Sequence, residues 1–225
     1  MKINLFKEKS NILLGYILVT GTAFFTAFSY IFGKKVSEEL YPETVAFYWF
    51  FGAFLFALVK RLIFGLFGTK FRVSISDLWK YKELMIMSSI VTVFGVAFWV
   101  IALRSAGPPI TSFLMKFQVV FSVMLGAIFL RERLKKLEIF GILLTIFGGL
   151  VITYDTSFFE LHGAFYAVMA AFCYSCLFII VKKKGSNLNM MMVATLRSLG
   201  VSIIGILYLI LSGRFQLPNN IDLVY

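Results

Sequence analysis

The chain alternates long apolar runs with short polar segments that are mostly basic. The seven apolar runs, all largely uncharged, are 15–32, 45–59, 84–103, 110–130, 139–152, 163–181 and 190–211. A helix needs about 20 apolar residues to cross the hydrocarbon core of a bilayer. Backbone amides in lipid must be satisfied within their own segment, so each run predicts a helix. The pattern therefore predicts an all-α polytopic membrane protein with seven spanning helices.

Composition and charge support the same class. Hydrophobic residues make up 60% of the 225 residues, and the formal net charge is +11. The positive charge lies in short clusters between the apolar runs, which suits lipid headgroups and the control of topology better than nucleic acid. Cys173 and Cys176 lie inside an apolar run, and no second cysteine pair or nearby histidine completes a metal site. We therefore expect a lipid bilayer around the protein and no nucleic acid, metal or cofactor.

The basic residues also predict the orientation. They gather in the N-terminal segment and in the loops within 60–82, 131–136 and 182–184, whereas the opposite set of loops holds only Lys34, Lys35, Arg104 and Arg214. Basic loops favour the cytoplasmic side of a membrane. We expect a cytoplasmic N-terminus in an integral protein of the plasma membrane, the inner membrane of a bacterium.

A weak internal repeat divides the chain. With a shift of about 148 residues, 15–24 aligns with 163–172, 31–35 aligns with 179–183, and Gly52 aligns with Gly200. A chance match between apolar helices is the alternative. A first repeat of five helices makes the second enter the membrane from the opposite side, and such inverted repeats are typical of secondary transporters. We predict a first repeat at 1–155 and the start of a second at 156–225, so that seven of an expected ten helices are present.

The segment from the third to the fifth run carries a family likeness. It contains Ala-Leu-Arg-Ser-Ala-Gly-Pro-Pro at 102–109, Phe-Leu-Arg-Glu-Arg-Leu at 129–134, and Gly141 followed by the pair Gly148 and Gly149. This arrangement resembles the EamA module of the drug/metabolite transporter superfamily. The resemblance implies ten helices in two inverted five-helix repeats. The family has Gly-Glu-Arg where this chain has 131–133, and a proline frequent in its fourth helix would fall at Val119.

Polar residues inside the apolar runs are candidates for the substrate pathway. Lys116 lies about seven residues into its run, where a charge is costly unless it faces a cavity or a partner. We predict that it lines the pathway and favours a carboxylate or phosphate, with snorkelling to the outer interface as the alternative. Gln118 points to a different face and could bond another helix. Arg197 is a further pathway candidate; the resemblance favours an ion pair there, and snorkelling is again the alternative.

Two aromatic residues and three residues near the fourth and fifth runs complete the candidates. Trp49 and Tyr30 could form an aromatic pocket for a planar substrate, although most aromatic residues pack or face lipid. The resemblance gives Glu132 and Arg133 structural or gating roles at the inner end of the fourth helix, with an exposed carboxylate as the alternative for Glu132. Gly141, like the later glycines of its run, suits close contact between helices in lipid.

The leading functional hypothesis is a secondary active transporter of small organic metabolites that works by alternating access. Its direction stays open between export, exchange and uptake. One alternative is a truncated fragment that inserts without transporting. Another is a seven-helix receptor, which the inside N-terminus and the lack of a lysine in the last span disfavour. The apolar runs contain no His-Glu pair or aspartate pair, so no enzyme is expected; the expected partners are a small-molecule substrate, lipid and, as an open possibility, a second copy in a homo-oligomer.

Overall fold

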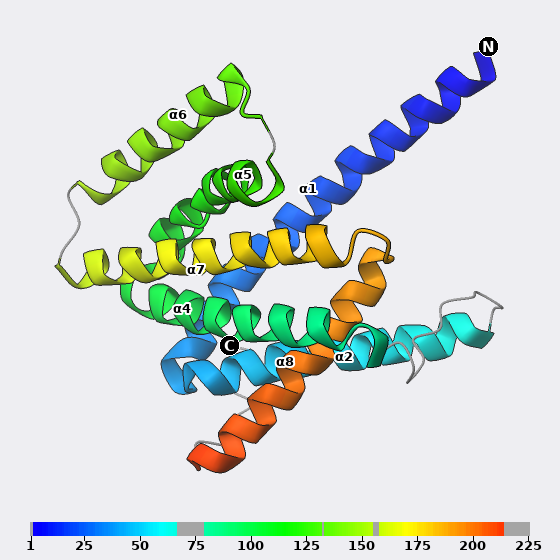
Figure 1. Cartoon of the computed structure of the whole chain (residues 1–225). Helices are drawn as coiled ribbons and strands as arrows, with labels where there is room; N and C mark the ends of the chain where they lie inside the picture. The colour runs from blue at the N-terminus through cyan, green and yellow to red at the C-terminus, as the bar shows by residue number, and fades with distance from the viewer. Residues whose placement is uncertain (1, 67–78, 132, 155–157, 214–225) are drawn as a thin grey trace.

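The computed structural model describes residues 2–66, 79–131, 133–154 and 158–213, and every regular element in them is an α-helix (Figure 1). The helices are α1 (Lys2–Glu39), α2 (Pro42–Leu66), α4 (Lys82–Leu114), α5 (Phe117–Leu130), α6 (Lys136–Thr153), α7 (Phe158–Lys184) and α8 (Met190–Ser212). Six of them are long and apolar enough to cross a membrane, and α5 is a shorter apolar helix. The predicted all-α polytopic class is confirmed.

The third and fourth predicted spans meet in a kink at Gly107. The label α4 covers the third span and the first turns of the fourth, and Gly107 is a non-helical residue between these two helical segments. Gly107 itself has φ 75° and ψ 170°, a backbone region that glycine enters without steric cost. The following Pro108 and Pro109 lack an N–H donor, and the start of a helical segment tolerates this.

The predicted run 110–130 is also broken, between α4 and α5. The backbone N–H groups of Lys116, Gln118 and Val119 bond to carbonyls three residues earlier rather than four. This tighter turn interrupts the α-helical ladder without the proline that is frequent at the position of Val119. Spanning helices with such interruptions are found where they line a cavity or meet neighbouring helices.

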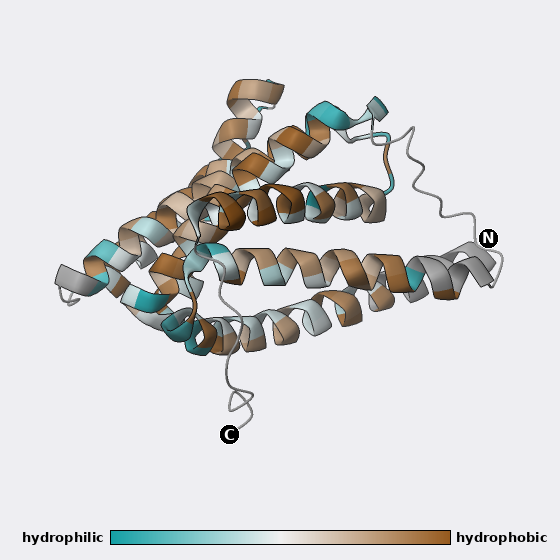
Figure 2. Ribbon diagram, turned by 90° about the horizontal axis from the view of Figure 1, so that it is seen from below, coloured by the Kyte–Doolittle hydropathy of each residue, from teal (hydrophilic) through white to brown (hydrophobic). Residues whose placement is uncertain are grey.

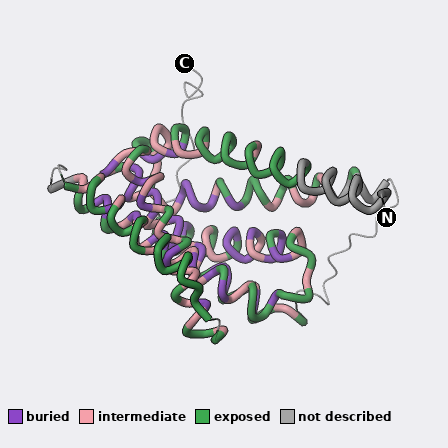
Figure 3. The backbone as a smooth tube through the Cα atoms, turned by 90° about the horizontal axis from the view of Figure 1, so that it is seen from above, coloured by how far each residue is buried: buried purple, intermediate pink, exposed green. Residues whose placement is uncertain are grey.

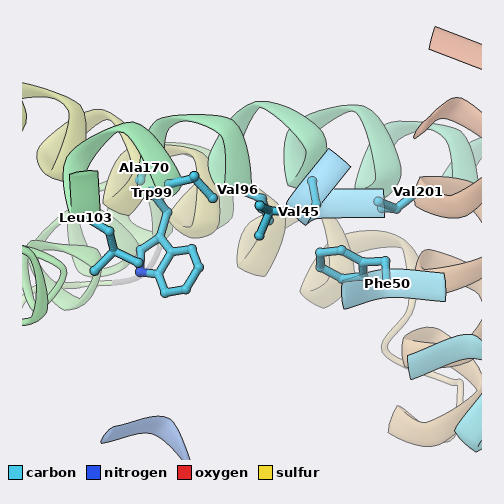
Figure 4. Close-up of a cluster of buried hydrophobic side chains, with 9 residues drawn as sticks. Val45, Phe50, Val96, Trp99, Leu103, Ala170 and Val201 are labelled. Atoms are coloured by element: carbon cyan, nitrogen blue, oxygen red, sulfur yellow. The ribbon is translucent and has the colours of Figure 1, made fainter. Parts of the chain in front are cut away.

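Helix α4 lies at the centre of the bundle. It packs along most of its length against α7, and it also contacts α8, α1 and α2. The main buried cluster joins residues of α4 with residues of α2, α7 and α8, and Figure 4 shows Val45, Phe50, Val96, Trp99, Leu103, Ala170 and Val201 in it. Glycines allow the closest approaches: Gly163 of α7 lies against Ala106, and Gly200 of α8 lies against Ser89.

The outer helices bury little of their surface. The apolar stretch of α1 from Leu14 onward and most of α6 are not covered by other helices (Figure 3). The exposed residues of both helices are largely apolar (Figure 2). In α6, Gly148 lies tightly against Phe113, and Gly149 lies tightly against Phe117. Gly141 differs, because a Cβ added there would meet no described atom within 4 Å. Among the residues described, the close helix contact expected at Gly141 does not form, whereas it forms at the two later glycines.

Two polar clusters mark the opposite ends of the bundle. At one end, Nζ of Lys184 forms an ion pair with Glu83, joining the end of α7 to the start of α4. At the other end, Nζ of Lys34 donates to the carbonyl oxygen of Arg104 at 2.8 Å. The loops that the basic residues assign to opposite sides thus lie at opposite ends. Which end faces the cytoplasm stays a prediction, as do the repeat boundaries.

Candidate functional site

A cavity of about 600 Å³, which we call the α7–α8 cavity, lies between α7 and α8 and reaches α5. Its lining residues are Gln118, Tyr174, Leu177, Phe178, Val181, Lys182, Ser186, Met190, Val193, Ala194 and Arg197. Ser186 belongs to the connection between the helices, and Arg197 lies seven residues into α8, a rise of about 10 Å. The cavity therefore runs from one end of the bundle toward the middle of α8.

Helix α8 is positioned by its ends and by a contact with α4. The side chain of Asn189 accepts a hydrogen bond from the backbone N–H of Met191 and caps the first turn, and Gly213 ends the helix with φ 63°. In the middle, Oγ of Ser89 donates to the carbonyl oxygen of Arg197 at 3.3 Å, beside the close approach of Gly200. These contacts fix the height of Arg197 relative to α4.

The guanidinium of Arg197 is held by aromatic residues. Its Cζ lies 5.7 Å from the centroid of the Phe50 ring, and Tyr174 of α7 lines the same cavity. Its Nε is buried and has no hydrogen-bond partner among the described residues. Within residues 2–66, 79–131, 133–154 and 158–213, the ion pair that the family likeness suggested for Arg197 does not form with a carboxylate.

A second cavity of about 660 Å³ adjoins the first. We call it the α5–α6 cavity, and it is lined by Gln118, Val119, Ser122, Val123, Arg133, Leu134, Lys135, Glu138, Phe178, Ile179 and Lys182. Gln118, Phe178 and Lys182 line both cavities. Its carboxylate, Glu138, accepts a hydrogen bond at 2.8 Å from the backbone N–H of Lys135 and so caps α6. The lining of the two cavities together thus has four positive side chains, Arg133, Lys135, Lys182 and Arg197, and one carboxylate, Glu138.

The structure brings two predicted pathway residues together and leaves a third apart. Gln118 and Arg197 line the same cavity. Lys116 is exposed at the break between α4 and α5 and lines neither cavity. Gln118, two residues further on, is half-buried and lines both cavities. The pathway-lining role predicted for Lys116 is therefore not supported by its position.

The predicted aromatic pair meets around a third aromatic residue that sequence reasoning did not select. Tyr30 and Trp49 each make an edge-to-face contact with Trp99 of α4, with centroids 5.5 and 5.6 Å apart. None of the three lines either cavity, and Trp49 is 43% exposed. The neighbour of Trp49, Phe50, is the aromatic residue that contacts Arg197.

The motif after α5 is partly described. Glu132 lies outside the described residues, whereas Arg133 is exposed and lines the α5–α6 cavity. Arg131 ends α5 in the left-handed region with φ 55°. Glycine enters this region without steric cost, and glycine is the residue expected at this motif position from the likeness. Gly141 touches neither cavity.

The comparison with known families decides the assignment. The model of the EamA-like transporter family matches residues 13–154, more than half of the chain. The chain belongs to the EamA-like transporter family. The members of this family are membrane transporters of the drug/metabolite superfamily rather than enzymes. No curated protein and no solved structure matches the chain at a significant level.

The family match and the cavities overlap only in part. The matched segment of this EamA-family protein contains α5 and α6, and with them Gln118 and Arg133. Helices α7 and α8, which supply Tyr174, Phe178 and Arg197, lie beyond it. The candidate site is thus built where the matched segment packs against the following two helices. Among the residues described, no group of three or more His, Cys, Asp or Glu side chains could hold a metal ion.

Proposed function

We propose that this EamA-family protein is a secondary active transporter of small organic metabolites and that the α7–α8 cavity is part of its pathway. The observation that carries the proposal is a cavity that runs from one end of the bundle to Arg197, a charged residue seven residues into α8. Its volume of about 600 Å³ lies within the range typical of small-molecule sites. Few polar groups among many apolar ones are also typical of such sites.

The basic residues give the cavity a direction. They predict that the connection between α7 and α8 faces the cytoplasm, so the cavity opens inward in the plasma membrane of a bacterium. Transport then requires a second state in which Arg197 becomes accessible from outside. Export, exchange and uptake are all compatible with this scheme. A small-molecule substrate and the surrounding lipid are the proposed partners, and a homo-oligomer is compatible with the same scheme.

The break between α4 and α5 supplies a place where the pathway can change shape. Gln118 lies just after the break, and its carbonyl oxygen accepts a hydrogen bond from Oγ of Ser175 at 2.8 Å. This bond ties α5 to α7 beside the cavity wall. Interrupted helices near mid-membrane are a recurring feature of transporter sites. A rotation of α5 about the break would therefore alter the wall that Gln118 forms.

The proposal is tested by filling the cavity. The intact chain is reconstituted in liposomes, and uptake of representative amino acids, nucleosides, sugars and organic acids is measured. Ala194→Trp places a large ring in the cavity, whereas Leu207→Trp adds the same ring at an exposed position of α8 outside both cavities. We expect transport of at least one compound that Ala194→Trp abolishes and Leu207→Trp preserves. Equal transport by both variants contradicts the proposed route, and no transport of any compound supports the alternative of a chain that inserts without transporting.

A further inference from the structure

We propose that the α7–α8 cavity binds a small organic anion whose negative group pairs with Arg197. The inference rests on the proposed function and narrows it to a substrate class. It concerns a carboxylate or phosphate group attached to an apolar body. Arg197 is the deepest charged residue of the cavity, and its surroundings supply the reasons.

The first reason is an unbalanced charge. A cation within a membrane-spanning helix is costly unless a partner or a water-filled cavity compensates it. Aromatic contact with Phe50 offsets part of the cost. The carboxylates of Glu38 and Glu83 pair with Lys34 and Lys184 at the ends of the bundle, away from Arg197. An incoming anion would complete the compensation.

The second reason is an unused donor. Nε of Arg197 is buried and has no acceptor within the described part of the chain. A guanidinium presents its N–H groups in a planar fork, which matches the two oxygens of a carboxylate or phosphate. Because Nε is covered in this structure, a ligand that offers such oxygens would satisfy it after a small shift of the guanidinium toward the cavity. An uncharged ligand of the same shape would satisfy it less well.

The rest of the cavity suits the apolar body of such an anion, and a positive side chain lies at the end from which the anion would enter. Leu177, Phe178 and Val193 supply apolar walls. Lys182 lies at the end near the connection, where its charge raises the local concentration of anions. In the adjoining cavity the carboxylate of Glu138 is bonded to the N-terminus of α6, which lowers its repulsion of an anion.

The experiment measures protection of a cysteine in the cavity. Ala194→Cys is made together with Cys173→Ser and Cys176→Ser, and the intact chain is reconstituted in phosphatidylcholine vesicles. Labelling by a water-soluble maleimide is timed with benzoate or with benzamide, its uncharged analogue of similar shape. We expect benzoate to slow labelling in a concentration-dependent way and benzamide to have a much weaker effect.

Matched variants assign the effect to one charge. Arg197→Gln should raise the benzoate concentration needed for half-protection at least about tenfold, and Arg197→Lys should raise it less, since the charge remains without the fork. Lys184→Gln removes one positive charge outside both cavities and should leave protection unchanged. Each variant is first checked for a single folded species by size-exclusion chromatography, and Arg197→Lys decides alone if Arg197→Gln does not fold.

Several outcomes overturn the inference. Equal protection by benzoate and benzamide, no protection by either, or protection that survives in the Arg197 variants would each exclude an anion at Arg197. Slowed labelling in vesicles that contain phosphatidylglycerol, with no further effect of benzoate, would assign the anion to a lipid headgroup and also overturn it. The anion site and the transport route can fail separately. If a neutral compound is transported and Ala194→Trp blocks it, the route stands without the anion site. If benzoate protects the cysteine but no compound is transported, the anion site stands without the route.

Discussion

The contact of α7 with α4 makes Gly163→Ala a sensitive test of the packing. A Cβ at this position would lie 2.6 Å from the backbone nitrogen of Ala106 and 2.8 Å from Cβ of Ser105. Ordinary van der Waals contact begins near 3.4 Å, so the helices must separate by about 0.8 Å. The nearest atom belongs to backbone rather than to a flexible side chain. A rotamer change therefore cannot absorb the added methyl group.

The expected cost follows from the general effect of overpacking. Inserting a methyl group into a tightly packed interface destabilises a protein by about 1–3 kcal/mol. For a chain of this size each kcal/mol lowers the melting temperature by about 2–4 °C, so Gly163→Ala should lower it by about 2–12 °C. The melting temperature is measured in detergent by intrinsic tryptophan fluorescence, and the folded fraction by size-exclusion chromatography.

Gly21→Ala is the matched control. A Cβ at Gly21 would meet no described atom within 4 Å, and alanine is the better helix former. Its melting temperature should equal or exceed that of the unsubstituted protein. If Gly163→Ala and Gly21→Ala melted at the same temperature, the close approach of α7 to α4 would be refuted.

Three further predictions concern other contacts. Arg131→Gly should raise the stability by up to about 1 kcal/mol, because relief of the left-handed strain exceeds the added freedom of glycine in the unfolded chain; a lower melting temperature would contradict this. Ser175→Ala should lower the stability by about 1 kcal/mol, because the hydroxyl that donates to the carbonyl oxygens of Gln118 and Ala171 is lost. Denaturant titration of Ser175→Ala beside Ser175→Cys measures the loss, and unchanged stability would contradict it. A double-mutant cycle on Lys184 and Glu83 should give no measurable coupling at physiological salt, since the pair is exposed, and a clear coupling would mean that this end is shielded from water.

Hydropathy predicts the helical class of this protein because lipid leaves few alternatives. The runs that became α2, α6, α7 and α8 needed only length and the lack of charge. The break before Gln118 could not be predicted in this way, because no glycine or proline lies at Met115 or Lys116. It depends on how α5 packs against α7, which is tertiary information.

The candidate site was predictable where a polar residue stands out from an apolar run. Gln118 and Arg197 were found for that reason, and the structure places both on one cavity. Phe50, Tyr174 and Phe178 were missed, because aromatic residues make up 18% of the chain and no pattern separates the cavity wall from the lipid face. The depth of a residue along a helix does not tell which way its side chain faces. Lys116 was selected for its depth, but it lines neither cavity.

The internal repeat shows the same limit. Gly163 and Gly200 lie tightly against α4, whereas a Cβ at Gly15 or Gly52, their counterparts under the shift, would meet no described atom within 4 Å. Residues that align in sequence thus have different neighbours in this bundle. The alignment predicts helices at matching positions, but it does not predict which helix packs against which glycine.

The inward-opening cavity is tested most directly by the side from which it can be reached. The introduced cysteine of Ala194→Cys, in the Cys173→Ser and Cys176→Ser background, is exposed to a membrane-impermeant maleimide in intact cells and in inverted vesicles. We predict that Ala194→Cys is labelled faster in inverted vesicles than in intact cells, because the cavity opens inward in this state, and that Lys34→Cys is labelled in intact cells alone. Faster labelling of Ala194→Cys from outside, or labelling of Lys34→Cys from the cytoplasmic side, would contradict the account.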